Sequence, residues 1–575
     1  MFGRHLVRLS TLRPGSLSVL AIAGIVGACS SGTAPQIRLC TAADAAVTLS
    51  VGQYVSIDPG PDSGCLVFPA TAALAAEYLI VPQLTSGIPG QTAGFRLNGD
   101  TILPAPSAPV QPAAELSRAE RFHTYLRLGD ERRSWGFAPE PGGGRTPQAS
   151  TTASPPGMNT LRTFQVCAKT DCTRFDRVGA RVRALNGKVA IFVDTLAPAG
   201  GLDSTALAGI ATTFDQRLYP IDTAAFGRES DIDSNTVVLV LMTNTVNKLV
   251  TANECNGSGG AFVAGFFFGA DLDPAFRNDS RSNKGEVFYS IVADPGGTLS
   301  CSHSTVEVER FVPVTFVHEF QHMISFNQHV LKRGGTGEVL WLNEGFSHYA
   351  EELGGRSYAV SPGGKINDCT LSTTECRFYG GDLLDAYEYL DTTSKHFLLP
   401  TAGIGSLAER GAAWLFVRYT VDRYAAGTTR ADWDTLTRSL VGTAQTGAQN
   451  IAAVTGDPFP TVVSRWALAN YLTDGAGVAP ELQYDSWNLH AVYSSLHTQT
   501  QSNPQTPFPK FYPLTPPMSA GPAVNLAGTL RAGSGVYQLI EQPAGEPGFT
   551  LSFTAPNGAP INAAAMPRLT VIRLQ

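Results

Sequence analysis

The chain has 575 residues, of which 43% are hydrophobic, so it is long enough for two or three domains with separate cores. Only 15% of the residues are charged and the formal net charge is -7. These values argue against a nucleic-acid partner, which would require a basic surface. Beyond the amino-terminal segment, no apolar run is long enough to span a membrane.

Residues 1–29 predict an export signal. Three arginines precede an apolar run from Leu17 to Val26, which is too short for a permanent membrane helix. The run ends in Val26-Gly27-Ala28-Cys29, which resembles a bacterial lipobox, so we expect cleavage before Cys29 and a lipid anchor on it in the bacterial cell envelope, which would be the outer membrane if the cell is Gram-negative. Ordinary signal cleavage with secretion is the alternative.

The cysteines fit an exported protein. Nine are present, and setting Cys29 aside for lipid leaves an even number, which favours disulfides in an oxidising compartment. Pairing between neighbours is the simplest expectation: Cys40 with Cys65, Cys167 with Cys172, Cys255 with Cys301, and Cys369 with Cys376. Metal binding by Cys167 and Cys172 is a competing interpretation.

Residues 30–136 contain short alternating runs separated by Gly, Pro, Asp and Ser, which predict an amino-terminal β module of sandwich type. Residues 137–160 have almost no apolar side chains and should form a linker. Strand-like runs return in residues 485–575 and predict a second, carboxyl-terminal β module.

Between these modules, residues 161–484 predict an α+β domain. Strand-like runs come first, with a hairpin turning at Asn186-Gly187 and a helix capped by Asp203 or Ser204. From about Val312 the pattern becomes helical and stays so. Strands followed by helices indicate α+β rather than a doubly wound fold.

The stretch "FVPVTFVHEFQHMISFNQHV" contains the motif H-E-x-x-H. Residues four apart on a helix lie about 40° apart around its axis, so His318 and His322 can hold one ion, and Glu319 at the rim can reach a water on it. We expect Pro313 in the first turn of this helix. His329 lies about 10 Å of rise beyond His322, so we expect it at the surface or as a cap.

Two imidazoles leave Zn²⁺ short of its usual third protein ligand. The metzincin pattern fails, because Ser325 and Gln328 stand where its Gly and His would be. The better candidate is Glu344 in "WLNEGFSHYAEEL", which begins a helix with an apolar stripe on another face. His348 is an alternative third ligand.

These segments, with "GAAWLFVRY" further along the chain, resemble the hyicolysin-type family of secreted bacterial zinc peptidases, which are gluzincins. The resemblance implies a thermolysin-like catalytic domain with a β-sheet subdomain and then a helical one. It implies His318, His322 and Glu344 as zinc ligands and Glu319 as general base and acid. The acidic residue that supports a histidine in thermolysin-like proteins is replaced by His348, with Glu351 and Glu352 as possible substitutes.

An oxyanion formed during hydrolysis needs a further donor. Tyrosines on the later helices are candidates, although such residues are more often part of the core: Tyr387, Tyr389, Tyr419 and Tyr424. Two acidic pairs, in "SDIDSN" (230–235) and "GADLDP" (269–274), have a spacing that could bind Ca²⁺, although neither completes an EF-hand loop and turn chemistry explains them as well.

The sequence therefore predicts an exported, lipid-anchored zinc endopeptidase that acts on protein or peptide substrates. An aminopeptidase is an alternative within enzymes, although no "GxMEN"-like motif is present to capture a substrate amine. A surface adhesin or sugar-binding lipoprotein, inactive or with structural zinc, is the alternative from another class. A serine hydrolase has little support, because no G-x-S-x-G motif occurs.

Overall fold

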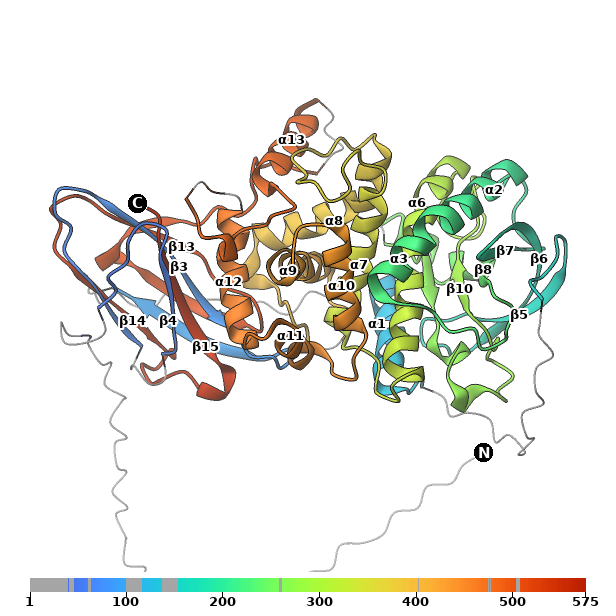
Figure 1. Cartoon of the computed structure of the whole chain (residues 1–575), viewed down its shortest axis with the longest axis horizontal. Coiled ribbons are helices and arrows are strands. Elements are labelled where there is room, and N and C mark those ends of the chain that lie inside the picture. The colour runs from blue at the N-terminus through green and yellow to red at the C-terminus, as the bar shows by residue number, and fades with distance from the viewer. Residues whose placement is uncertain are drawn as a thin grey trace, which may run out of the picture.

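We describe the protein from a computed structural model. The described residues are 40, 46–59, 64–99, 116–136, 154–257, 261–401, 403–473, 475, 477–502 and 507–575. The export signal, Cys29 and most of the expected linker lie outside this part of the chain. Along the chain, a sheet half (residues 154–304) precedes a helical half (residues 305–502). Figure 1 shows the β domain at one end of the molecule and the sheet half at the other, with the first helix of the helical half, α6 (Thr305–Phe326), lying beside the sheet.

The sheet half is built on a six-stranded mixed sheet. Its strands lie in the order β5 (Leu161–Cys167), β6 (Phe175–Asn186), β7 (Val189–Asp194), β8 (Val238–Met242), β10 (Val287–Ser290) and β9 (Gly265–Phe267). β5, β6 and β7 form an antiparallel meander, β7, β8 and β10 run parallel, and β9 closes one edge as an antiparallel strand. The β6–β7 hairpin pairs Asn186 with Val189, so its loop is Gly187-Lys188, one residue beyond the expected turn.

The connection from β7 to β8 is helical. Asp203 caps α2 (Ser204–Thr213), as one of the two expected caps, through a hydrogen bond from Ala206 N. Helix α2 continues into a π turn (Phe214–Leu218) and then into α3 (Tyr219–Phe226). Shorter helical segments follow β8 and β9: α4 (Asn244–Asn247), α5 (Ala252–Cys255), η2 (Gly269–Asp271) and η3 (Pro274–Phe276).

The helical half follows. It contains α6 (Thr305–Phe326), α7 (Leu340–Arg356), α8 (Thr374–Asp391), α9 (Leu407–Tyr424), α10 (Arg430–Val441), α11 (Gly447–Thr455), α12 (Phe459–Leu472) and α13 (Leu489–Ser502). α9 is buried on nearly all sides and packs against α7 and α8. Strands followed by helices make residues 161–484 an α+β unit, as expected. No helix among the described residues has both the length and the apolarity to cross a membrane.

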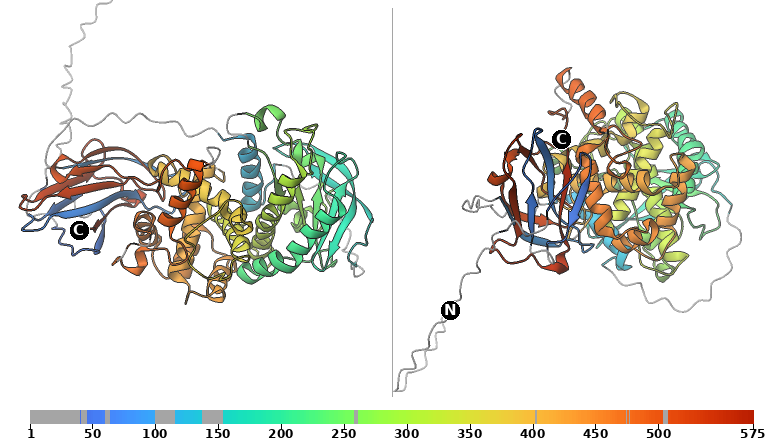
Figure 2. Two further views of the ribbon diagram at one scale, coloured as in Figure 1. Left: turned by 90° about the horizontal axis from the view of Figure 1, so that it is seen from above. Right: turned by 60° about the vertical axis from the view of Figure 1, so that its left-hand side comes forward.

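The two expected β modules are one structure, which corrects the predicted domain division. One sheet has the order β1-β15-β3-β13-β11 and the other β12-β4-β14-β2. The strands are β1 (Tyr54–Ile57), β2 (Cys65–Phe68), β3 (Ala76–Leu84), β4 (Thr92–Asn98), β11 (Met518–Ala520), β12 (Asn525–Arg531), β13 (Gln538–Gln542), β14 (Phe549–Thr554) and β15 (Pro567–Arg573). In Figures 1 and 2 blue amino-terminal strands therefore lie beside red carboxyl-terminal ones.

This β domain, which is built from both amino-terminal and carboxyl-terminal strands, has its own core between the two sheets. Phe68 of β2 stacks on Phe549 of β14 with ring centroids 4.5 Å apart, and both pack with Tyr78 of β3 in one buried cluster. β3 lies between β13 and β15, so the amino-terminal strands alone would leave β3 without either neighbour. Neither end of the chain can complete the domain without the other.

Two helices fall inside the segments expected to be β modules. α1 (Arg118–Arg132) begins at Ser117, whose hydroxyl accepts from Glu120 N while the Glu120 carboxylate accepts from Ser117 N. α13 occupies residues 489–502. Figure 2 shows α1 standing at the boundary between the sheet half and the helical half, outside the β domain.

The structure joins the eight described cysteines in neighbour order. The disulfides are Cys40–Cys65, Cys167–Cys172, Cys255–Cys301 and Cys369–Cys376. Cys167 and Cys172 therefore bond to each other, which contradicts the alternative interpretation of these two residues as metal ligands. Each disulfide closes a loop of at most 46 residues, so the four act as local constraints on the chain.

A buried ionic network joins α7 to α9. Glu352 accepts hydrogen bonds from Arg356 Nε (2.5 Å), Trp414 Nε1 (3.0 Å) and Trp487 Nε1 (3.0 Å), and lies 3.4 Å from Arg418 Nη1. Burial opposes the ionisation of Glu352, but the two arginines outweigh it and hold the pKa of Glu352 below its usual value. The ionised carboxylate is therefore part of the packing between these helices.

We expect Glu352→Gln to lower the free energy of unfolding by roughly 3–5 kcal/mol at pH 7, because it leaves the buried Arg356 without its counter-charge and Arg418 with Asp422 alone. Since the folded-state pKa of Glu352 is depressed, the contribution is present above the unfolded pKa of about 4.3 and is lost as the pH falls through the folded value. Urea unfolding at pH 7 and below pH 4 measures it, with exposed Glu541→Gln as control. An equal difference between wild type and Glu352→Gln at both pH values would contradict this account.

Candidate metal centre

Helix α6 carries the H-E-x-x-H motif. It begins after Ser304, whose hydroxyl accepts from Glu307 N while the Glu307 carboxylate accepts from Ser304 N. This capping box places the start at Thr305, so Pro313 lies inside the helix and not in its first turn, which corrects our expectation. α6 packs against β9 and β10 of the sheet, which fixes the side of the helix that bears the motif.

His318, His322 and Glu344 meet in one buried group. The Nε2 atoms of His318 and His322 are 3.2 Å apart, and the Glu344 carboxylate oxygens lie 3.8 Å from the first and 3.5 Å from the second. Ligand atoms held 2.0–2.2 Å from a tetrahedral ion are separated by about 3.3–3.6 Å. The spacing therefore suits a single divalent metal ion.

The chemistry of the group fits a metal as well. Glu344 is 1% exposed, and neither of its carboxylate oxygens has a hydrogen-bond partner among the described residues. A buried carboxylate without partners is costly unless a cation compensates it. Two imidazole nitrogens and one carboxylate oxygen are ligands that zinc accepts.

The protonation states of these residues also suit metal binding. Burial lowers the pKa of His322 to about 3, so its imidazole is neutral at pH 7. Burial opposes the ionisation of Glu344, but the proximity of His322 and then His318 holds its pKa well below the usual value. A neutral imidazole and an ionised carboxylate are the forms that coordinate metals.

Residues of α7 orient both imidazoles. Nδ1 of His318 lies 2.7 Å from Glu351 Oε1, and Nδ1 of His322 lies 3.1 Å from Asn343 Oδ1. Because these oxygens only accept, each Nδ1 carries the proton and each Nε2 is left to face Glu344. Of the two residues considered as substitutes for the missing acidic support, Glu351 contacts a histidine of the motif, whereas Glu352 belongs to the arginine network.

His348 lies beside the group. Its Nδ1 is 2.7 Å from Asp382 Oδ1 and 3.3 Å from Glu351 Oε1, and its ring centroid is 5.0 Å from that of His318. A second set of potential ligands, His318 with His348 and Glu351, is also compact. In that set, however, the Nδ1 atoms of His318 and His348 both lie against the same oxygen of Glu351, so both atoms already have the same partner within the protein. Glu344 is the residue that approaches the Nε2 atoms of both motif histidines.

Glu319 lies between α6 and the edge strand of the sheet. It is 2% exposed, and its Oε2 accepts a hydrogen bond from the backbone N–H of Phe267, the last residue of β9 (2.8 Å). Burial raises the pKa of Glu319, while the charges of His318 and Arg127 oppose the rise. The carboxyl group is therefore held in one place and has an increased proton affinity.

Helix α1 adds polar groups that sequence reasoning missed. Arg127 is fully buried, and its Nη2 donates to the backbone carbonyl of Phe267 (2.6 Å), so both hydrogen-bonding groups of Phe267 are used by Arg127 and Glu319. Burial lowers the pKa of His123 to about 3, with the carboxylate of Glu344 opposing the shift. Two features of the sequence could have predicted α1: the capping box formed by Ser117 and Glu120, and the helical spacing of Phe122 and Leu126.

The four tyrosines do not reach the group. Each hydroxyl is engaged elsewhere: Tyr387 with Lys510 N, Tyr389 with Ser534 Oγ, Tyr419 with Glu481 O, and Tyr424 with Asp457 Oδ2. They belong to the packing between helices and the surrounding loops, so the structure does not place them as oxyanion donors.

His329 is fully buried in a π turn (Asn327–Leu331) that extends α6, which corrects the expectation of a surface or capping residue. Its Nε2 lies 3.8 Å from Glu338 Oε2, and burial lowers the pKa of His329 to about 4. The extension of α6 beyond Phe326 carries the imidazole into the core. It takes no part in the candidate metal centre.

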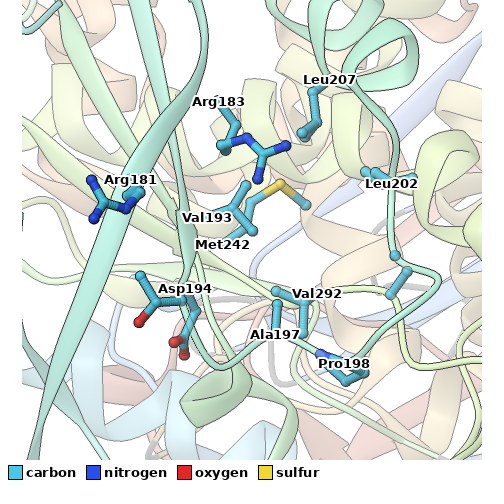
Figure 3. A pocket seen from close by; sticks show the side chains of 13 residues that line it. Arg181, Arg183, Val193, Asp194, Ala197, Pro198, Leu202, Leu207, Met242 and Val292 are labelled. Carbon is cyan, nitrogen blue, oxygen red and sulfur yellow. The ribbon is translucent and has the colours of Figure 1, made fainter. Parts of the chain in front are cut away.

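A cavity of about 410 Å³ lies elsewhere in the sheet half. Figure 3 shows Arg181 and Arg183 on its rim, with Met242, Leu207 and Val193 lining it. Its carboxylate, Asp194, already accepts from Thr243 Oγ1 and Leu196 N, each at 2.8 Å. None of the motif residues lines this cavity, so it is separate from the candidate metal centre.

A comparison with known proteins finds a partial similarity to a metalloprotease. No protein-family model matches the sequence. The neutral metalloprotease ShpI of Staphylococcus hyicus is 30% identical to this chain over 145 residues. That stretch covers 25% of this chain and 30% of ShpI, so the chain matches less than a third of the length of this relative.

We expect Glu351→Gln to weaken zinc binding about 10- to 100-fold, because the amide cannot hold the His318 ring as the carboxylate does. Zinc competition with a fluorescent chelator measures the affinity directly. Exposed Glu546→Gln should bind zinc as the wild type does. Unchanged affinity in Glu351→Gln would show that the 2.7 Å contact does not orient the ligand.

Proposed function

We propose that this protein is an exported zinc-dependent metallopeptidase that cleaves peptide bonds within protein or peptide substrates. The observation that carries the proposal is the meeting of His318 and His322 from α6 with Glu344 from α7, with Glu319 fixed beside them. The partial similarity to ShpI, whose name describes a neutral metalloprotease, supports the same activity. The proposal includes a thermolysin-like arrangement of residues 161–484.

The number of ligands favours a catalytic role for the metal. His318, His322 and Glu344 supply three protein ligands, whereas structural zinc sites are closed by four. A zinc ion bound here would lower the pKa of a coordinated water towards neutrality and polarise the carbonyl of a substrate. Burial favours the neutral form of His322, which is the form of an imidazole that binds a metal.

Glu319 is the proton-transfer group in this proposal. Its carboxylate accepts the proton of the attacking water and donates it to the leaving nitrogen of the peptide bond, so no covalent enzyme intermediate forms. Burial supports this role, because a raised pKa brings the carboxylate closer to the pH at which it must both take and give a proton. The hydrogen bond from Phe267 N to Oε2 keeps the carboxylate from swinging away.

The proposal that the protein is exported rests on the composition of its amino-terminal segment and on its cysteines. The basic and apolar opening of the chain and the lipobox-like Cys29 favour delivery to the cell envelope with a lipid anchor. The four disulfides favour an oxidising compartment. Both observations are compatible with a peptidase that meets its substrates outside the cytoplasm.

We expect Glu319→Gln to digest denatured casein at least 10³-fold more slowly than the wild type, because the amide cannot accept the proton of water. Its zinc content should remain that of the wild type, since Glu319 is not among the proposed ligands. The measurements are the release of soluble peptides and metal analysis of the purified protein.

Exposed Glu309→Gln, on the same helix, provides the matched control and should keep full activity. Undiminished digestion by Glu319→Gln, or no digestion by zinc-loaded wild type, would remove the support for a peptidase.

A further inference from the structure

A second group of carboxylates lies outside the candidate metal centre. Asp231 and Asp233 belong to the loop between α3 and β8, and Glu286 immediately precedes β10. One carboxylate oxygen from each of the three lies within 4.8 Å of the other two. The sequence pattern singled out the two aspartates, and the fold adds Glu286 to them from a distant part of the chain.

Glu286 supplies an observation that is independent of the aspartates. It is 1% exposed, and its Oε1 accepts from Ser230 Oγ (2.5 Å) and Ile232 N (3.0 Å). Its other oxygen, Oε2, is buried and has no hydrogen-bond partner in the described part of the chain. Leaving such an oxygen unpaired is costly, so the site has an unfilled requirement for a positively charged or donating group.

No side chain of the described residues pairs with Oε2 of Glu286, although the charge of Arg162 opposes the rise that burial causes in the pKa of Asp233. Among the ion pairs of the described residues, none joins a lysine or arginine to Asp231, Asp233 or Glu286. Burial raises the pKa of Glu286 to about 7, and the neighbouring charge of Asp233 adds to the rise. Burial and the charge of Asp233 therefore both disfavour the ionised form of Glu286.

The spacing of oxygen-bearing side chains in the loop resembles that of an oxygen-rich cation site. Asp231, Asp233 and Asn235 alternate along the chain, as do the first ligands of a calcium-binding loop, and Thr236 takes a positive φ of 66° where such a loop has its turning glycine. The aspartates also cap the turn, through Thr236 N to Asp231 Oδ1 and Asn235 N to Asp233 Oδ1, both 3.2 Å.

The approach of the loop to the strand depends on Gly285. A Cβ atom at this position would lie 2.8 Å from Asp233 Oδ2, closer than real Cβ contacts allow. Glycine therefore lets the Asp233 carboxylate come against the backbone beside Glu286. By contrast, Asp271 and Asp273 of the other acidic pair bind Asn283 N (2.6 Å) and Arg133, so turn and ion-pair chemistry accounts for them.

We propose that Asp231, Asp233 and Glu286 bind a calcium ion. The ligands are all oxygens, which suit Ca²⁺, Mg²⁺ or Mn²⁺ far better than zinc. Oxygens held 2.3–2.6 Å from Ca²⁺ lie within about 5 Å of one another, as these do. Mg²⁺ demands a near-ideal octahedron and keeps most of its water, whereas Ca²⁺ accepts ligands from separate segments in an irregular shell.

The ion would act on the fold. It would join the loop to the start of β10, where Glu286 O already accepts from Leu239 N of β8 (2.7 Å). β10 is the strand that pairs with β9, which in turn contacts Glu319 through Phe267. Calcium at this place would stabilise the edge of the sheet behind the candidate metal centre and is independent of the proposed peptidase activity.

The test uses the full mature chain, stripped of metals and reloaded with zinc, so that the two sites are separated. Calorimetric titration with CaCl₂ should show one Ca²⁺ bound per chain, and the midpoint of thermal unfolding should rise by several degrees with saturating Ca²⁺. Asp233→Asn with Glu286→Gln should weaken Ca²⁺ binding at least tenfold and abolish the rise. Its zinc content should be unchanged.

Glu309→Gln with Glu541→Gln removes the same charge from exposed positions and should respond to Ca²⁺ as the wild type does. If the buried double variant does not fold, Asp231→Asn at the exposed end of the cluster replaces it, with the same expected tenfold loss. Absence of binding by the wild type, or an equal response of wild type and site variants, would overturn the proposal. An equal effect of MgCl₂ would overturn its assignment to calcium.

Discussion

The contact between α6 and α7 is the constraint on which the candidate metal centre depends. It places a buried carboxylate, Glu344, against two imidazoles that lie one helical turn apart, 3.5 and 3.8 Å away. Neither oxygen of that carboxylate has another partner among the described residues. Further along α7, the ionic network of Glu352 with Arg356 and with Arg418 of α9 adds buried polar contacts that favour this register of the helix.

The sheet half and α1 hold the other side of the centre. β9 is an edge strand, yet the N–H and carbonyl of Phe267 are both occupied, by Glu319 and Arg127. α1 thereby links the edge of the sheet to the helix that carries the motif. It also reaches the helical half, since Thr124 Oγ1 accepts from Ile404 N. Residues from three separate regions of the chain thus contribute to the surroundings of the candidate metal centre.

Local signals in the sequence were sufficient for the motif and for much of the secondary structure. The spacing of His318 and His322 depends only on the pitch of a helix, and Asp203 caps α2 by chemistry within four residues. Long-range pairing was not predictable in this way: alternation marks β3 as a strand but does not say that β13 and β15 are its neighbours. The expected positions of the tyrosine hydroxyls and of His329 differ from the structure for the same reason. The groups that surround these side chains come from distant segments of the chain.

The pairing of β1 with β15 has a mechanical consequence. Tyr54 lies opposite Ile572 and Ile57 opposite Leu569, so the strands nearest the two ends of the described chain are bonded side by side. Tension applied between the ends of the protein would be borne by this ladder and by the neighbouring strands, and would bypass the helices that carry His318 and Glu344. A pull on both of these strands would therefore load the ladder between them before it reached the interior.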